Sequence, residues 1–267
     1  MNRLIETATN SSLTPAIEAV PKAWKADSPL PAHSNGFRRL EVRVNPDSRV
    51  VFQAEPNSVA VEQYRLLRRN LTEHFPQGGT LLITSPGKGD GKTLNAINLA
   101  WCLAETSSPT LLAEVDLRQP SISRVLNFNP APGIESAMSG ESRPESVVSA
   151  VNGTSLHVAA VAKAQADPVH LLKSPAAKDF LEWARGKFRW VLLDAPPVIP
   201  AADVPELAPL VDAILMVVRV RTTPRDLVRK SFELVGDRLR GVILNEATLC
   251  WDSYYHYFSH YQSMDQK

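Results

Sequence analysis

The sequence predicts an α/β fold, a mostly parallel twisted sheet with helices on both faces. Three observations predict it: apolar runs alternate with segments of helical periodicity, a glycine-rich turn follows one of these runs, and carboxylates follow two others. Runs that are apolar throughout are typical of strands covered on both faces, and helices between them indicate parallel crossovers. We therefore expect one layered domain without internal repeats.

The expected strands are short. They are Leu81–Thr84, Thr110–Val115, Leu156–Ala160, Trp190–Leu193, Ala213–Val218 and Val242–Leu244. Helical periodicity predicts helices over Thr93–Glu105, Ser142–Val151, Ser174–Lys187 and Pro224–Val235. Right-handed crossovers place the carboxyl ends of all these strands on one edge of the sheet, where ligands bind in such folds.

The segment LLITSPGKGDGKT at Leu81–Thr93 resembles a P-loop, although Pro86 occupies the position of its usual first glycine. Backbone N–H groups of such a loop surround phosphates, Lys92 reaches the β/γ-phosphate oxygens, and the Thr93 hydroxyl binds Mg²⁺. The helix that follows directs its positive end at the same phosphates. The expected nucleotide-binding residues are Gly87, Lys88, Gly89, Asp90, Gly91, Lys92, Thr93 and Leu94.

Carboxylates follow two of the expected strands. Asp194 ends the run WVLLD, which is typical of a Walker B strand, whose acid holds Mg²⁺ directly or through water. Glu114 and Asp116 end the run LLAEVD, and their i, i+2 spacing on an extended segment puts both on one face. Such a pair suits a metal ion or the proton of a hydroxyl group, and the alternative is that these acids only cap turns.

Length and composition set further limits. The chain has 267 residues and a net charge of +1, which argues against a broad nucleic-acid-binding face. Cys102 and Cys250 lack metal-ligand or redox spacing, and Cys102 is expected to be a buried thiol in a reducing cytoplasm. No signal peptide or run of eighteen apolar residues is present, so we expect a soluble chain without a transmembrane segment.

Three regions are expected. Residues 1–48 are rich in proline and serine without a sustained period, which predicts a disordered extension. Residues 49–250 form the nucleotide-binding domain and residues 251–267 a tyrosine-rich tail. A helix over Ser58–His74 carries Glu62, Arg65 and Arg68 on one flank, where the simplest interpretation is a solvated face with local ion pairs.

These motifs together resemble the bacterial tyrosine kinases of polysaccharide synthesis and export, the BY-kinases, over about residues 50–262. TSPGKGDGKT is similar to their Walker A, LLAEVDLRQP to their Walker A′, VLLDAPP to their Walker B, and GVILNEA to their last strand. The flank formed by Glu62, Arg65 and Arg68 resembles the family's Glu-x-x-Arg-x-x-Arg helix. The resemblance implies a P-loop NTPase fold.

The resemblance also implies an activity. The γ-phosphoryl group of ATP would pass to C-terminal tyrosines of a neighbouring subunit, here Tyr254, Tyr255, Tyr257 and Tyr261. Lys92 would neutralise phosphate, Thr93, Asp116 and Asp194 would hold Mg²⁺, Glu114 would be the base, and Asn245 would contact adenine. The Glu62/Arg65/Arg68 helix would mediate ring-like self-association. A membrane polysaccharide co-polymerase would activate the chain and hold it at the inner face of the membrane.

Departures from the family keep alternatives open. Glu114 stands where the family has Asp, and the extra methylene predicts slow turnover that Glu114→Asp would raise if the site is merely detuned. The alternative is an ATP-binding regulatory subunit without kinase activity. A partition-type ATPase is disfavoured, because its second P-loop lysine would fall at Gly87 rather than at Lys88. The tail could instead pack on a partner.

Overall fold

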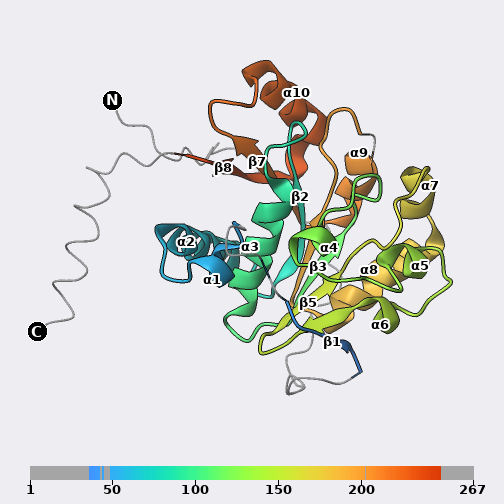
Figure 1. The fold of residues 1–267 in the computed structure, drawn as a ribbon. Coiled ribbons are helices and arrows are strands. Elements are labelled where there is room, and N and C mark those ends of the chain that lie inside the picture. Colours follow the sequence, from blue (N-terminus) through green and yellow to red (C-terminus); the bar gives the residue numbers. More distant parts are fainter. Residues whose placement is uncertain (1–35, 43, 45–48, 202, 248–267) are drawn as a thin grey trace, which may run out of the picture. The chain divides into compact units, whose positions relative to one another are not determined.

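The computed structural model describes residues 36–42, 44, 49–201 and 203–247, all within one compact unit spanning Ala32–Lys267. The four tail tyrosines, Cys250 and most of the expected extension lie outside the described residues. The described part of the chain is a sheet with helices packed on it (Figure 1).

One eight-stranded sheet organises the described chain, in the order β1-β4-β5-β3-β6-β2-β7-β8. All neighbouring pairs are parallel except β4–β5, which is antiparallel. The strands are β1 Arg38–Leu40, β2 Gly79–Thr84, β3 Thr110–Glu114, β4 Ser149–Val151, β5 Leu156–Ala159, β6 Trp190–Asp194, β7 Ala213–Arg219 and β8 Leu239–Asn245. The mostly parallel α/β sheet is thus confirmed.

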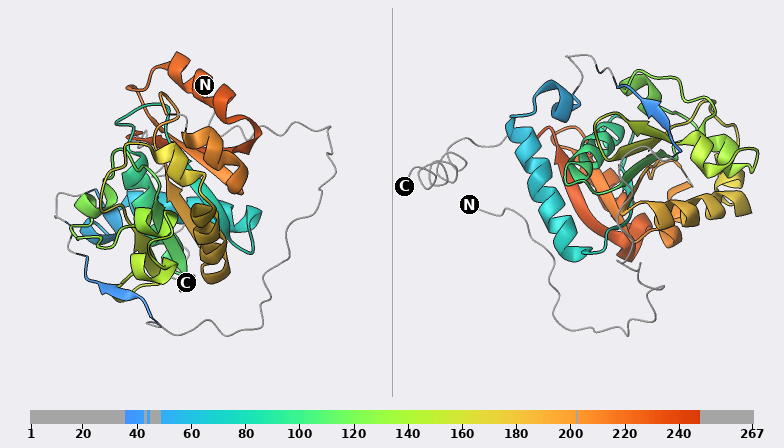
Figure 2. Two further views of the ribbon diagram at one scale, coloured as in Figure 1. Left: turned by 90° about the vertical axis from the view of Figure 1, so that its right-hand side faces the viewer. Right: turned by 90° about the horizontal axis from the view of Figure 1, so that it is seen from below.

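Helices cover both faces of the sheet, as the apolar runs predict (Figures 1 and 2). Residues of four helices share one hydrophobic core: α1 Val51–Ala54, α2 Val59–His74, α3 Lys92–Ala104 and α4 Ile122–Val125. The second core receives α5 Ile134–Met138, α6 Pro144–Val147, α7 Pro168–Leu172, α8 Pro175–Lys187, α9 Asp203–Leu207 and α10 Arg225–Val235. Two 3₁₀ turns, η1 Ala208–Leu210 and η2 Gly236–Arg238, precede β7 and β8.

The register of the central strands brings the expected site together. Glu114 pairs with Asp194 across β3–β6, and Ile83 pairs with Asp194 across β2–β6. The carboxyl ends of these three strands therefore lie side by side, at the edge where the P-loop segment leaves β2. The prediction that ligand-binding residues gather at this edge rests on the parallel register, and that register is confirmed.

Two sequence predictions about local structure are wrong, the first of them for only part of its segment. The segment 1–48 contains β1, which pairs in parallel with β4 and buries Leu40, so order begins before Val50. A strand of three residues is too short to show a period against its polar surroundings. The expected helix Ser142–Val151 is a short α6 followed by β4, because the β-branched residues Val148 and Val151 favour extended backbone there.

Candidate functional site

The loop between β2 and α3 ends at a glycine in the left-handed region of backbone conformation. Gly91 has φ +93° and caps the N-terminus of α3, and a Cβ atom there would come within 2.2 Å of the Asn245 side chain. Only glycine fits this position without strain. Lys92 and Thr93 therefore begin a helix of thirteen residues, whose free N–H groups and positive end face the loop.

Lys92 joins the two carboxylates that the sequence places in the site. Its Nζ lies 2.9 Å from Asp116 Oδ2 and 3.6 Å from Asp194 Oδ1, and its side chain is 12% exposed. Burial alone would lower the pKa of Lys92, but the Asp194 and Asp116 carboxylates outweigh it and raise that pKa. The lysine is thus held as a cation at the mouth of the loop.

Asp194 is fully buried, and among the described residues neither of its carboxylate oxygens accepts a hydrogen bond of normal geometry. Burial raises its pKa, while Lys92 and Thr93 act in the opposite direction. An orphaned buried carboxylate beside a lysine and a threonine fits a divalent cation. No cluster of three His, Cys, Asp or Glu that could hold a metal ion occurs in the described chain.

Glu114 makes contacts that differ from those expected. It is fully buried; its Oε1 accepts N–H bonds from Ser121 and Ile122 (2.8 Å to Ile122), and its Oε2 accepts one from Val161 at 3.0 Å. Burial raises the pKa of Glu114, and the three backbone donors counteract this. The carboxylate anchors the start of α4 to the end of β5.

Glu114 and Asp116 therefore do not share one set of contacts. The strand β3 ends at Glu114, so Asp116 lies beyond the extended segment and need not share a face with Glu114. The N–H groups of Val115 and Asp116 both bond to the Asp194 carbonyl, at 2.9 and 3.0 Å, which turns the chain. Asp116 then reaches Lys92, while its Oδ1 accepts from Gln119 N–H at 3.1 Å.

Two hydroxyl residues that sequence reasoning missed contact the loop. Ser121 Oγ lies 3.0 Å from Thr93 Oγ1, so the residue held by Glu114 touches the expected Mg²⁺ ligand. Thr223 Oγ1 donates to Asp90 Oδ1 at 2.6 Å, while Asp90 Oδ2 accepts from Gly87 N–H at 3.0 Å. Both come from loops distant in sequence, and no local pattern distinguishes them from ordinary turn residues.

The remaining expected nucleotide-binding residues lie around the same loop. Asn245 Nδ2 donates to the Asp90 carbonyl at 2.9 Å, so the end of β8 contacts the P-loop. Lys88 and Gly89 are exposed at its tip, and Leu94 is half-buried against the core of the α2–α3 face. Sequence reasoning also missed Asp203, whose buried carboxylate lies 3.6 Å from Arg118 Nε, next to the Walker A′ segment.

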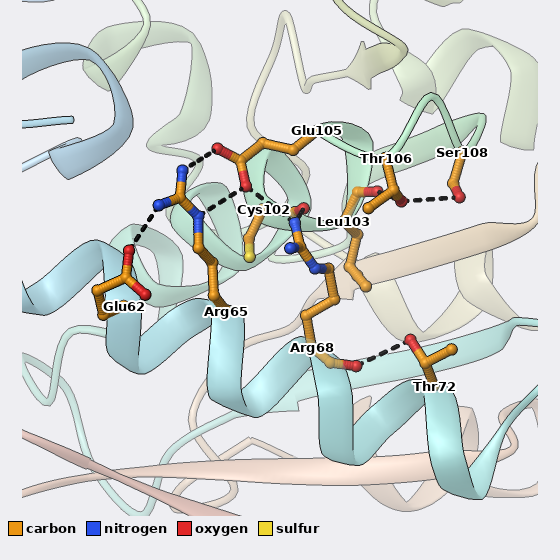
Figure 3. Close-up of polar contacts among 9 residues, drawn as sticks. All are labelled: Glu62, Arg65, Arg68, Thr72, Cys102, Leu103, Glu105, Thr106 and Ser108. Carbon is orange, nitrogen blue, oxygen red and sulfur yellow. Dashed lines mark hydrogen bonds and ion pairs between the residues drawn. The ribbon is translucent and has the colours of Figure 1, made fainter. Parts of the chain in front are cut away.

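The Glu62/Arg65/Arg68 flank of α2 is engaged with α3 in the same chain (Figure 3). Arg65 bonds to Glu62 at 2.6 Å and to Glu105 at 2.8 Å, and Arg68 bonds to Glu105 at 2.8 Å. Arg68 also donates to the carbonyl of Cys102 at 2.7 Å. This corresponds to the alternative of local ion pairs, and a contact with another subunit would have to form around these bonds.

No known family model matches the chain, but the known proteins similar to it agree with the resemblance that its motifs indicate. Tyrosine-protein kinase YwqD of Bacillus subtilis is 29% identical over 237 residues, which cover 85% of this chain and all of YwqD. Succinoglycan biosynthesis transport protein ExoP of Rhizobium meliloti is 30% identical over 210 residues, 76% of this chain but 27% of ExoP.

A solved structure extends the likeness to the fold. The crystal structure of the VpsO kinase domain is 27% identical and superposes with a TM-score of 0.66, covering 74% of this chain and 99% of that domain. No helix among the described residues is long and apolar enough to cross a membrane. In sequence and in fold, this chain is similar to the P-loop kinase domains of the bacterial tyrosine kinases found in polysaccharide systems, as its motifs predict.

Proposed function

We propose that the chain is a Mg·ATP-dependent protein tyrosine kinase of a polysaccharide synthesis or export system. The observation that carries the proposal is the contact of Lys92 with Asp116 and Asp194 beside a P-loop, at the carboxyl edge of a parallel sheet. The names of the similar proteins, one a tyrosine-protein kinase and one a succinoglycan biosynthesis transport protein, support the reaction and the system.

The geometry supports phosphoryl transfer by positioning and charge. In this proposal Lys92 and the N–H groups at the start of α3 neutralise the β/γ-phosphates, and Thr93, Asp116 and Asp194 would hold Mg²⁺. Mg²⁺ held by these residues would supply positive charge opposite the phosphate oxygens. A tyrosine oxygen bonds to the γ-phosphorus, the bond to the bridging oxygen of ADP breaks, and the phenol proton passes to a carboxylate.

Asp116 is the better candidate for that proton. It contacts Lys92 beside the P-loop and accepts one backbone N–H bond, from Gln119, whereas the fully buried Glu114 accepts three. This observation also keeps the second candidate function, an ATP-binding regulatory subunit without kinase activity. In that case the Lys92 site binds and exchanges nucleotide, and assembly with a partner is the output.

The substrates and partners belong to the proposal as well. The acceptors are Tyr254, Tyr255, Tyr257 and Tyr261 of a neighbouring subunit, within a tail at 251–267. The chain assembles into a ring-like oligomer through α2 and is held at the inner face of the membrane by a co-polymerase. Each phosphate adds about −1.5 to −2 charges, so a phosphorylated tail leaves the acidic site and the oligomer dissociates.

The deciding experiment incubates the purified full chain with Mg·ATP and the cytoplasmic segment of its membrane partner. We expect phosphotyrosine on the tail by mass spectrometry, and none in Lys92→Ala. A variant with all four tail tyrosines changed to Phe is the matched control for the acceptor. If no tyrosine is modified, and Glu114→Asp restores none, while ATP still binds, the regulatory-subunit function replaces the kinase.

A further inference from the structure

A cavity of about 380 Å³ lies between the C-terminal halves of α2 and α3 and the amino ends of β3 and β6. Its volume is in the range of pockets that hold small molecules. Trp190, the first residue of β6, lines it, whereas Asp194, the last, belongs to the candidate nucleotide site. Four residue steps of a strand span roughly 13 Å, so the cavity and the nucleotide site lie at opposite ends of β6.

The walls of this cavity carry an excess of positive charge. Arg68, Arg69 and Arg189 line it, against one lining carboxylate, Glu73. Arg68 is neutralised by Glu105, which lies outside the cavity lining. Arg69 pairs with Glu73 at 3.0 Å, but these side chains are 75% and 58% exposed, and exposed pairs of this kind are weak.

Within the described ranges, Arg189 is the cation of this cavity that has no carboxylate partner. Its Nη2 donates to the Pro76 carbonyl at 2.9 Å and its Nη1 to Ser108 Oγ at 3.4 Å. Both partners are neutral, and no carboxylate within the described ranges pairs with it. A guanidinium group held by two neutral acceptors keeps free N–H donors for an anion.

Hydroxyl groups complete the polar wall. Thr106 Oγ1 and Ser108 Oγ lie 3.1 Å apart, and Thr72 lies across from them on α2 (Figure 3). Hydroxyls beside a fork of arginine donors are the groups that recognise phosphate and carboxylate oxygens. Leu103 and Trp190 give the cavity an apolar floor.

We propose that this cavity is a second binding site, separate from the nucleotide site, for a small molecule that carries a phosphate or carboxylate group. Arg189 and Arg69 bind the oxyanion, and the Ser108 hydroxyl beside Arg189 orients it. Glu73 opposes binding, since it competes for Arg69 and repels the anion.

The test measures binding of inorganic phosphate and, in a separate arm, of acetate, to the full chain at constant ionic strength. Lys92→Ala serves as the parent, so that phosphate in the P-loop does not contribute. Phosphate is followed by ³¹P line broadening and acetate by saturation transfer. Phosphate binding without acetate binding assigns a phosphate ligand, and the reverse assigns a carboxylate.

Four variants of that parent decide the matter. Arg189→Gln is expected to weaken anion binding about tenfold and Arg69→Gln about threefold, because each removes a charge-assisted donor. Glu73→Gln is expected to strengthen binding severalfold. Arg229→Gln changes an exposed arginine of α10 that pairs with Asp226, and it should leave binding unchanged.

The opposite results overturn the site. Anion binding that is the same in Arg69→Gln and Glu73→Gln as in the parent would show that the cavity does not hold it. Since both residues are exposed, these two variants should fold even if Arg189→Gln does not. Absence of any measurable phosphate or acetate binding to the folded parent would also reject the proposal.

Discussion

Shortening Glu114 to Asp is the sharpest test of what this buried acid does. The change keeps the charge and retracts both carboxylate oxygens by about 1.5 Å, the length of one C–C bond. Glu114 reaches backbone donors on two sides, at the start of α4 and at Val161 beyond β5. An aspartate cannot reach both sides, so at least one buried N–H group loses its partner.

The expected cost follows from these contacts. A buried donor without a partner costs about 1–3 kcal/mol, and loss of one buried methylene adds about 0.8 kcal/mol. We therefore expect Glu114→Asp to lower the free energy of unfolding by about 2–4 kcal/mol. At roughly 2–4 °C per kcal/mol for a domain of this size, Tm falls by about 4–16 °C.

Glu135→Asp is the matched control. Glu135 also accepts two backbone N–H bonds, from Ala162 at 3.1 Å and Lys163 at 2.9 Å, in the chain next to Val161. Glu135 is only half-buried, so water can replace these bonds and the expected cost is below about 1 kcal/mol.

Thermal unfolding of the two variants and the parent gives the answer, with phosphotyrosine formation measured on the same samples. If Glu114 anchors the backbone, Glu114→Asp should lower Tm strongly, Glu135→Asp should not, and the kinase rate should not increase. A Tm equal to that of the parent would refute this reasoning. An increased kinase rate would instead make Glu114 a base displaced by one methylene.

Three further predictions concern other residues. Lys92→Ala should weaken Mg·ATP binding by about 30- to 1,000-fold, a loss of about 2–4 kcal/mol of binding free energy. If calorimetry shows undiminished ATP affinity in a folded variant, the segment is not a P-loop. Changing Arg65 and Arg68 together to Glu should abolish higher oligomers, measured by light scattering, while ATP still binds. Glu105→Gln is the control, because it weakens only the ion pairs of these arginines within the chain. If Glu105→Gln abolishes the oligomers equally, the arginines do not contact another subunit directly. Burial raises the pKa of the Cys102 thiol to about 12, so the reactive thiolate is scarce below that pH. After treatment with an alkylating reagent at pH 8, mass mapping should find Cys102 unmodified in the native chain and alkylated in the unfolded chain. Rapid alkylation of the native chain would contradict the burial of Cys102.

The repeating features of the sequence predicted most of the fold. Apolar runs such as Leu81–Thr84 and Ala213–Val218 agree with the observed strands to within two residues, since burial on both faces of a sheet leaves a continuous apolar signal. Lys92, Asp116 and Asp194 were predicted to meet because parallel strands end on one edge. The short β1 and β4 were not predicted, since three residues carry too little periodicity to outweigh their neighbours.

Local patterns in the sequence are enough to predict the fold class and the charged residues of the site. How those residues are used depends on the folded arrangement. Glu114 binds backbone N–H groups far along the chain, and Thr223 reaches the P-loop across 133 residues. Arg189 faces a cavity formed with α2 because the strand order places the start of β6 there. Contacts between a side chain and a distant backbone group have no period, so they emerge only when the chain is folded.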